Sequence, residues 1–303
     1  MKKKSTKMKK ITEVTSTRLI SDSDIKRPLY KVIYLLIILF LICMCMVTIL
    51  PTLWIFASAF KNTKEFLQVP PTIIPRSFEP EKVLQVWQNV NFFRYLKNSI
   101  ILICGDLVCT IVFNGMAGYV FSKLKPAGSA FIYKLIFITM LLPTSMNMIP
   151  LYSEFVDFPL LGINITGSFL PIWMMACFSA FNIMLFKNFF DSVPTSIVEA
   201  ARIDGETELG IFAKIIIPLS KPIIMVVAIF TTVAAWGSFM WPYLVLKKES
   251  MQPVAVMLFN MQSQLSVDKY MVVMMLSIIP PLIIFFCFSK QIMGGMSIGG
   301  VKE

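Results

Sequence analysis

Histidine is absent from the 303-residue sequence, and cysteine is confined to apolar surroundings. Histidine is the side chain that titrates near neutral pH and the commonest metal ligand. Its absence excludes catalysis by histidine and metal binding through histidine. The six cysteines act as small hydrophobic residues inside apolar runs and predict neither a disulfide framework nor a metal site. They are Cys43, Cys45, Cys104, Cys109, Cys177 and Cys287. We therefore expect no metal and no cofactor.

Charged residues are scarce as well. They make up 15% of the chain, against 56% hydrophobic residues and a mean hydropathy of +0.74. A soluble globular protein is about 25% charged, so this composition predicts an integral membrane protein. The net charge of +11 does not indicate nucleic-acid binding, because ten of the 28 lysines and arginines precede Val32 in a tail beside the first apolar run. Such a tail is typical of a segment that faces the lipid bilayer.

Long runs with at most one charge recur along the rest of the chain. A helix needs roughly 20 apolar residues to cross a hydrocarbon core of about 30 Å. Six runs approach or exceed this length and predict an all-α fold with six transmembrane helices. The predicted spans are residues 32–60, the run between Lys97 and Lys123, residues 135–153, the run between Asp157 and Lys187, residues 223–245 and residues 271–289. Pro143 and Pro150 predict kinks in the third.

These spans divide the chain into a basic tail (1–31), a six-helix membrane domain (32–289) and a C-terminal tail (290–303). If the N-terminus lies inside the cell, nineteen lysines and arginines fall on inner segments and nine on outer ones. Cytoplasmic segments are enriched in these residues. We therefore predict a multi-pass protein of the cytoplasmic membrane with both termini in the cytoplasm.

A charged segment, residues 199–222, interrupts the apolar second half of the chain. Its polar groups require solvent or partners, so it is predicted to lie outside the bilayer. Pro194 suits the first turn of a helix, Ser196 and Glu199 have the spacing of a capping box, and Gly205 is expected to end the helix. The small side chains of Ala200 and Ala201 are expected to share a face that another surface can approach closely.

A second amphipathic helix is expected after Gly205. Its apolar residues recur at offsets of three and four, which is the helical period. They are Leu209, Phe212, Ile216 and Leu219. The segment is thus predicted to form two short helices that meet at a bend along the membrane surface. A solvated interfacial loop with no specific partner is the alternative that these residues leave open.

The string EAARIDG at residues 199–205, followed by Phe212 and a proline-bounded apolar segment, resembles the EAA loop of ABC importer permeases. The resemblance extends over most of the chain. It includes Asn98–Ser99, Gly118–Tyr119, Pro150–Leu151–Tyr152, Phe189–Phe190 and Gly299–Gly300–Val301–Lys302. Together these residues resemble the carbohydrate-uptake subfamily of six-span, maltose-permease-like subunits, which implies the fold of a type I ABC importer permease.

The resemblance implies roles for several residues. The coupling loop would cover about residues 188–221 and dock on an ATPase subunit. The residues implied in this contact are Glu199 at its edge, Ala200, Ala201, Arg202, Ile203, Asp204, Gly205 and Phe212. The C-terminal tail would also reach the ATPase dimer, through Gly300, Val301 and Lys302.

The resemblance also implies partners and a mechanism. The partners are a second homologous permease, two ATPase subunits, an external solute-binding protein and a sugar. Because the chain has no GxxxxGK[ST] phosphate loop, we expect ATP hydrolysis on the ATPase partner and not on this chain. Two positions depart from the family pattern: Trp236–Gly237 stands where Trp-Asn is frequent, and Glu206 where alanine is common.

A sugar pathway requires aromatic faces for stacking and polar partners for hydroxyl groups. Two predicted spans carry candidates, which are Trp173, Phe178, Asn182, Trp236, Ser238 and Phe239. Aromatic residues are also common in lipid-facing belts, so each of them has this alternative interpretation. Asp106 is the only formal charge within the apolar core of a span, and its role can be structural or functional.

We therefore predict the transmembrane subunit of an ATP-driven importer that moves a sugar or oligosaccharide by alternating access. A permease for another solute, such as a polyamine or phosphate, is the main alternative. An ion-coupled secondary carrier would need several ionisable groups inside the membrane, and Asp106 stands almost alone. A membrane-embedded enzyme would need a catalytic cluster, which the spans do not contain.

Overall fold

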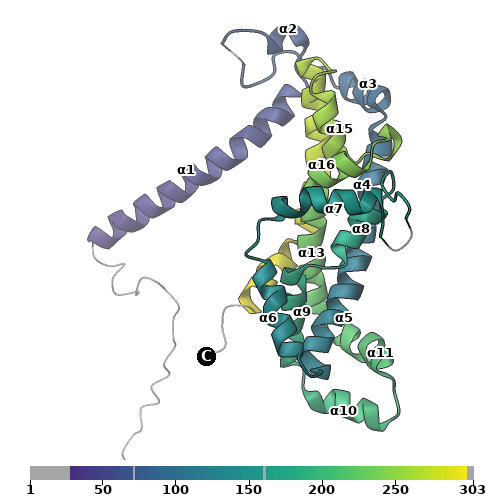
Figure 1. The fold of residues 1–303 in the computed structure, drawn as a ribbon. Helices are drawn as coiled ribbons and strands as arrows, with labels where there is room; N and C mark the ends of the chain where they lie inside the picture. Colours follow the sequence, from purple (N-terminus) through teal and green to yellow (C-terminus); the bar gives the residue numbers. More distant parts are fainter. Residues whose placement is uncertain (1–27, 71, 160–161, 299–303) are drawn as a thin grey trace, which may run out of the picture. The chain divides into compact units, whose positions relative to one another are not determined.

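A computed structural model of the chain describes residues 28–70, 72–159 and 162–298 (Figure 1). Apart from one isolated bridge between Phe158 and Ile163, the regular elements of these residues are all helical. The chain divides into two compact units, residues 1–54 and 55–303, and each is considered by itself. Gly300, Val301 and Lys302 lie outside the described residues, as does most of the basic tail.

The first half of the chain forms one long helix and several shorter ones. They are α1 (Pro28–Ser58), α2 (Thr63–Phe66), α3 (Glu81–Val90), α4 (Phe92–Cys109), α5 (Gly115–Tyr119), α6 (Ser129–Thr139) and α7 (Met148–Val156). Two π-helical segments, η1 (Thr110–Asn114) and η2 (Val120–Leu124), flank α5, and a 3-10 turn, η3 (Thr144–Asn147), precedes α7.

The second half begins with a bent helix pair. The elements of the second half are α8 (Leu170–Ala176), α9 (Ala180–Ser192), α10 (Thr195–Ile203), α11 (Glu208–Ile211), η4 (Phe212–Ile216), α12 (Ile217–Leu219), α13 (Lys221–Gly237), α14 (Met240–Val245), η5 (Glu249–Met251), α15 (Val254–Met261) and α16 (Val267–Ile298). Of these, η4 is a π-helical segment and η5 a 3-10 turn.

The described residues contain three helices that are long and apolar enough to cross a membrane, or up to five spans if each bent pair counts as one. The bent pairs are α8 with α9, at 42°, and the helix of Glu208–Leu219 with α13, at 83°. The expected count of six is therefore not confirmed. The expected third span, 135–153, is divided between α6 and α7, because the chain leaves the helix at Thr139 ahead of Pro143.

The predicted fifth span is also interrupted. Its helix, α13, ends at Gly237, and α14 begins only at Met240, whereas a continuous helix was expected to about Val245. Pro242 explains the interruption, because a proline ring collides with the carbonyl group four residues earlier, which here belongs to Ser238.

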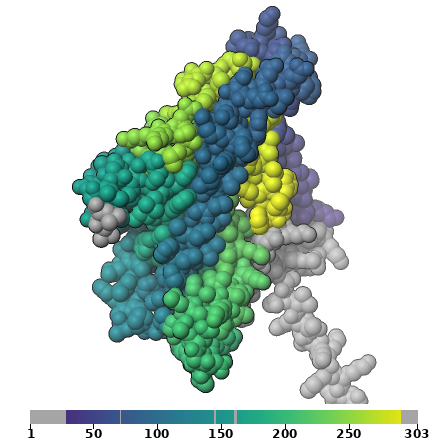
Figure 2. All heavy atoms as spheres, turned by 90° about the vertical axis from the view of Figure 1, so that its right-hand side faces the viewer, coloured from purple at the N-terminus to yellow at the C-terminus, as the bar shows by residue number. Residues whose placement is uncertain are grey.

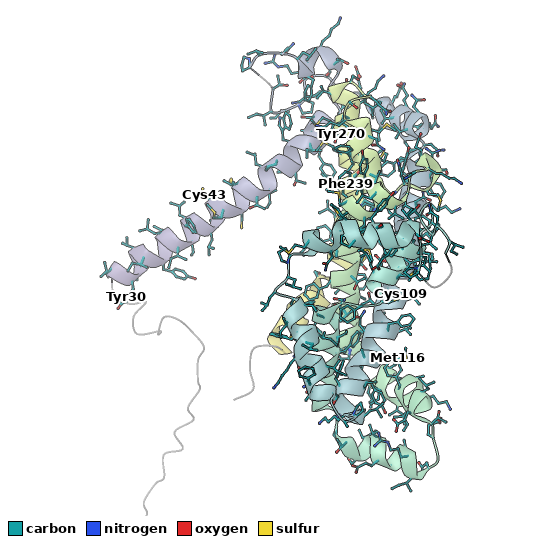
Figure 3. The ribbon with its side chains drawn as sticks, viewed as in Figure 1. Tyr30, Cys43, Cys109, Met116, Phe239 and Tyr270 are labelled. Atoms are coloured by element: carbon teal, nitrogen blue, oxygen red, sulfur yellow. The ribbon has the colours of Figure 1, made fainter. Side chains whose placement is uncertain are left out.

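The span Phe92–Leu124, which runs through α4, η1, α5 and η2, lies at the centre of the second unit. It packs against α8, α9 and α13, and Cys109 and Met116 mark its course in Figure 3. Gly118 permits the close approach of α9: a Cβ there would lie 2.7 Å from Phe186 Cβ and 3.0 Å from the backbone nitrogen of Lys187. A larger residue would therefore force α5 and α9 apart.

The residues Asn98 and Ser99 bind a distant part of the chain at the other end of this span. The Asn98 amide donates to the carbonyl oxygens of Ser250 and Gln252, at 2.8 and 3.0 Å. The Ser99 hydroxyl accepts from the backbone nitrogen of Val254 at 2.9 Å. Each of these contacts gives a side-chain partner to a backbone group near a helix end, where no partner exists within the helix. Together they stabilise the chain at the start of α15.

A compact loop follows α1 and is organised by one carboxylate. Glu65 is buried, and its Oε1 accepts from the Thr72 hydroxyl at 2.7 Å and the Arg76 nitrogen at 2.8 Å. Its Oε2 accepts from the backbone nitrogen of Ser77 at 2.7 Å and from the Ser77 hydroxyl. These hydrogen bonds lower the Glu65 pKa from 4.5 to about 2, and the bond from the Ser77 hydroxyl contributes most. The loop is thus stabilised above pH 4.5, and this contribution is lost as the pH falls towards 2.

We predict that Gly118→Ala lowers the melting temperature of the purified protein, at a cost of about 1–3 kcal/mol for overpacking the helix crossing. Thermal unfolding in detergent measures this. Gly237→Ala is the matched control, because a Cβ at Gly237 would meet nothing within 4 Å. Equal melting temperatures for the two variants would contradict the close α5–α9 contact.

We predict that Glu65→Gln opens the loop to trypsin, which cleaves after Lys64 and Arg76. The substitution removes the charge to which four donors are directed, so cleavage at pH 8 should be roughly tenfold faster. Digestion followed by mass spectrometry gives the rate. Glu79→Gln, an exposed glutamate of the same loop, should leave it unchanged.

Candidate functional site

The helix that carries the EAARIDG string, α10, begins directly after Pro194. Proline was expected inside the first turn and instead occupies the preceding cap position, with φ −58° and ψ 132°. The expected capping box between Ser196 and Glu199 does not form, because the cap residue is Pro194, whose side chain accepts no hydrogen bond. The bend of the chain at Val193 and Pro194 thus sets the start of the helix.

The expected break at Gly205 is confirmed. The helix ends at Ile203, and Gly205 adopts a φ of +80°, in the left-handed region that favours glycine. The Glu206 nitrogen donates to the carbonyl oxygen of Ala201 at 3.0 Å and so satisfies one of the last helical acceptors. Thr207 then caps α11 by accepting from the nitrogen of Gly210 at 3.1 Å.

The two faces of α10 differ sharply in exposure. Val198 and Ala201 are buried in an apolar cluster, whereas Ile203 is 86% exposed. Ala200 is also exposed, so the expectation that the two alanines share one outer face is wrong. Successive helical residues point about 100° apart, and here the second alanine faces inward. The outer face of the segment carries Glu199, Ala200, Arg202, Ile203, Asp204 and Gly205.

The second amphipathic helix also packs differently from the expected pattern. Phe212 and Ile216 are buried as expected, but Leu209 is 70% and Leu219 48% exposed. The segment η4 is π-helical and holds more residues per turn than an α-helix, so the period of 3.6 does not hold across it. Ile211 takes the inner position that Leu209 was expected to fill.

Ion pairs link the two parts of the segment. Arg202 Nε lies 2.7 Å from Glu208 Oε1, and Lys214 Nζ lies 2.9 Å from Glu206 Oε2. The hydrogen bond to Glu208 raises the Arg202 pKa, and that to Lys214 lowers the Glu206 pKa. Both pairs are exposed enough that each contributes little to stability, so they fix geometry more than they strengthen the fold.

Sequence reasoning did not identify the contact between this segment and the span Phe92–Leu124. The Tyr119 hydroxyl donates to Glu208 Oε2 at 2.8 Å, and the Tyr119 ring lies 5.7 Å from that of Phe212. In Figure 2 the segment, in green, lies against the lower end of the span, in blue. The Gly118–Tyr119 pair in the sequence was the only local signal of this contact.

Two of the expected pathway residues, Trp173 and Asp106, lie on α8 and α4, which pack against each other. The Trp173 indole covers Gly105, where a Cβ would lie only 2.0 Å from Trp173 Nε1, and its N–H donates to the carbonyl oxygen of Leu102 at 3.2 Å. Asp106, next to Gly105, is 8% exposed, and its Oδ1 has no hydrogen-bond partner among the described residues. Trp173 is therefore part of the α4–α8 contact.

Phe178 and Asn182 lie at or beside the break between α8 and α9. Phe178 is 54% exposed, and Asn182 is partly buried at the start of α9. Asn114, which sequence reasoning missed, is completely buried and bridges the break. Its Nδ2 donates to the Ala176 carbonyl oxygen at 2.9 Å, and its Oδ1 accepts from the Ser179 nitrogen at 2.7 Å.

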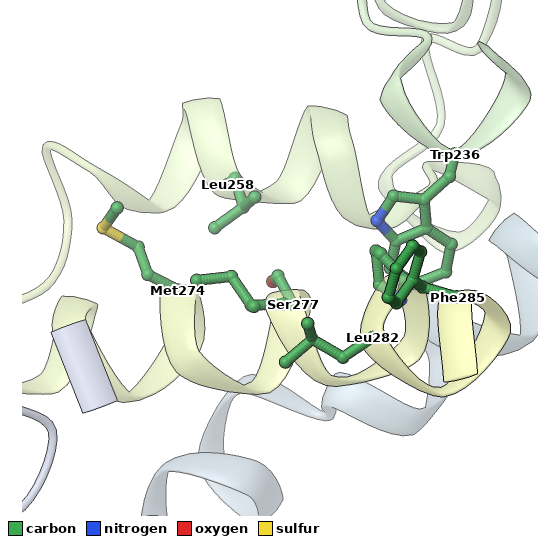
Figure 4. A pocket seen from close by; sticks show the side chains of 8 residues that line it. Trp236, Leu258, Met274, Ser277, Leu282 and Phe285 are labelled. Carbon is green, nitrogen blue, oxygen red and sulfur yellow. The ribbon is translucent and has the colours of Figure 1, made fainter. Parts of the chain in front are cut away.

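The remaining candidates lie at the end of α13. Trp236 lines an apolar groove of about 500 Å³ with residues of α15 and α16, among them Leu258 and Phe285 (Figure 4). Phe239 stacks on Tyr243 at 5.2 Å and contacts the ring of Phe259 at 5.0 Å. The expected pathway residues thus lie at the α4–α8 contact, at the break between α8 and α9 and at the end of α13, where Ser238 stands between α13 and α14.

Comparisons with known proteins identify the family. Residues 111–294, more than half of the chain, match the family described as binding-protein-dependent transport system inner membrane component. The chain belongs to this family. The predicted resemblance to ABC importer permeases is thereby confirmed, and the matched residues include the charged segment and the helices on either side of it.

Curated relatives of this inner membrane component cover most of its length. The arabinooligosaccharides transport system permease protein AraQ of Bacillus subtilis is 28% identical over 91% of this chain and 98% of its own. The diacetylchitobiose uptake system permease protein NgcG of Streptomyces coelicolor is 26% identical over 86% of each. A crystal structure of a bacterial ABC transporter involved in alginate import contains a chain with the same fold, with a TM-score of 0.77, 23% identity and coverage of 90% and 99%.

The inner membrane component should depend on Gly205 for the turn after α10. We predict that Gly205→Ala speeds amide hydrogen exchange over residues 197–211 by about 5- to 30-fold, because a left-handed alanine costs roughly 1–2 kcal/mol. Gly205→Asn is the graded control, since asparagine tolerates this conformation better and should lie between the two. Exchange that is the same in all three proteins would contradict the turn.

Proposed function

We propose that the chain is the membrane subunit of an ABC importer for a sugar or oligosaccharide. One observation carries the proposal: permeases for arabinooligosaccharides, diacetylchitobiose and starch degradation products each match at least 84% of this chain at 24–28% identity. The family description itself makes the chain the membrane component of a binding-protein-dependent system. A polyamine or phosphate cargo has no comparable support among these relatives.

The remaining subunits follow from the type of system. They are a second homologous permease, two ATPase subunits and an external solute-binding protein. ATP is hydrolysed on the ATPase subunits. The excess of lysine and arginine on alternate segments, nineteen against nine, supports cytoplasmic termini and a cytoplasmic α10. Residues 1–31 and 290–303 are then cytoplasmic tails around a membrane domain at 32–289, and Gly300, Val301 and Lys302 contribute a second contact with the ATPase.

The outer face of α10 is the docking surface for an ATPase subunit. Its exposed residues include the apolar side chain of Ile203, which is 86% exposed, beside the charges of Glu199 and Arg202. A protein that buried Ile203 would gain about 1.5–3 kcal/mol from this side chain. Ala201 and Phe212 support the segment from inside and do not themselves reach the partner.

The mechanism is alternating access. ATP binding draws the two ATPase subunits together and moves the docked segments, and the spans change from inward-open to outward-open. The sugar path passes the two helix breaks, where Phe178 and Phe239 offer rings and Asn182 and Ser238 offer polar groups. Asp106, which is buried on α4, supplies a polar group within the membrane.

The test compares two substitutions of isoleucine. Ile203→Asp should lower the recovery of the ATPase subunit by at least about tenfold after co-expression and affinity purification, since it places a charge in an apolar contact. Ile74→Asp is the matched control, because Ile74 is 79% exposed in the loop between α2 and α3. Recovery of no ATPase subunit with the unmodified chain would refute the proposed function, and equal recovery with both variants would refute this docking surface.

A further inference from the structure

Side chains of one membrane span bind the chain just before and just after α10. At its beginning, Lys123 Nζ donates to the carbonyl oxygen of Val193 at 2.5 Å. Beyond its end, Arg202 Nε pairs with Glu208 Oε1 at 2.7 Å, and the Tyr119 hydroxyl donates to Glu208 Oε2 at 2.8 Å. Tyr119 and Lys123 are four residues apart, at the end of the span that contains α5.

Apolar packing supports the same junction. Tyr119 is 3% exposed and shares one cluster with Val198 and Ala201 of α10. The ring of Phe212 fits over Gly115, where a Cβ would already lie 3.3 Å from Phe212 Cζ. Close packing leaves α10 little freedom to move without α5, because packed interiors transmit displacement.

The covalent connections of the segment are less rigid than this junction. Towards α9, the chain runs through Val193 and Pro194, outside helical structure. Towards α13, it turns by 83° at Ser220. The helix is therefore not continuous across this bend. The polar contacts at Tyr119 and Lys123 therefore fix α10 to the neighbouring span more directly than the chain does.

We propose that Tyr119 and Glu208 form a brace that, with Lys123, makes α10 and α5 move as one rigid body during transport. The inference rests on the proposed function, because the movement of α10 comes from a docked ATPase subunit. Tyr119 and Glu208 are positioning residues: they contact neither the cargo nor the partner. They decide which span receives the displacement.

The displacement has a defined destination within the membrane. The helix α5 lies between the π-helical segments η1 and η2, and such segments are frequent at functional positions in helices. Asn114, which directly precedes α5, bridges the break between α8 and α9. Movement of α5 therefore reaches the break that contains Phe178, one of the two helix breaks proposed for the sugar path.

Removing the Tyr119 hydroxyl tests the brace in the complete transporter. The chain is purified with its partner permease and ATPase subunits, reconstituted in liposomes with the binding protein, and supplied with a mixture of arabino-, chito- and maltodextrin oligosaccharides. For Tyr119→Phe, we expect normal recovery of the ATPase subunit and a drop of about 2- to 30-fold in sugar taken up per ATP hydrolysed. Glu208→Gln should act in the same direction. The double variant should lose little more than the worse single one, because the two residues act as a unit.

Tyr133→Phe is the matched control, since the Tyr133 hydroxyl on α6 has no hydrogen bond among the described residues, and it should leave the ratio unchanged. A Tyr119→Phe transporter with the normal ratio would overturn the brace, and so would one that fails to retain its ATPase subunit, because Tyr119 would then act in assembly. Failure of the proposed function is separate: the unmodified chain would then recover no ATPase subunit.

Discussion

The bilayer offers no water to polar backbone groups, and the arrangement of the second unit follows from this constraint. Each helix break must find its hydrogen-bond partners within the protein. At the break between α8 and α9, the buried amide of Asn114 supplies a donor and an acceptor. At the bend before α13, the Ser220 hydroxyl donates to the Ile216 carbonyl oxygen at 2.6 Å. The breaks are therefore stable features, which a transporter can use.

One span provides much of this support. Phe92–Leu124 carries Asn98 and Ser99 near its first end, Asn114 in its middle and Tyr119 near its last end. Each of these side chains binds a segment at least 62 residues away in the sequence. The span thus connects the loop before α15, the break in the membrane and the segment that carries the EAARIDG string. This position explains why a rigid link at Tyr119 has consequences elsewhere in the protein.

Local patterns predicted the local features well. The helix α10 ends ahead of Gly205, whose left-handed conformation suits glycine. The helix α6 ends ahead of Pro143, because the proline ring does not fit into a continuing helix. The sequence did not predict the faces of the helices around Gly205. Ala201 points inward, because successive residues of α10 point about 100° apart, and Leu209 points outward ahead of a π-helical segment that does not keep the period assumed by the pattern. The expected third span, read from apolar length alone, is divided because the helix ends at Thr139 ahead of Pro143.

The sequence by itself determined the membrane class, the helical content and the family, since these depend on composition and on motifs that are contiguous in the chain. Only the tertiary structure decided what the individual side chains do. Trp173, expected on a sugar path, covers Gly105, whereas Tyr119 meets Glu208 across a separation of 89 residues. Such contacts depend on how closely helices cross, and the small side chains of Gly105 and Gly118 fix those crossings only once the helices are packed.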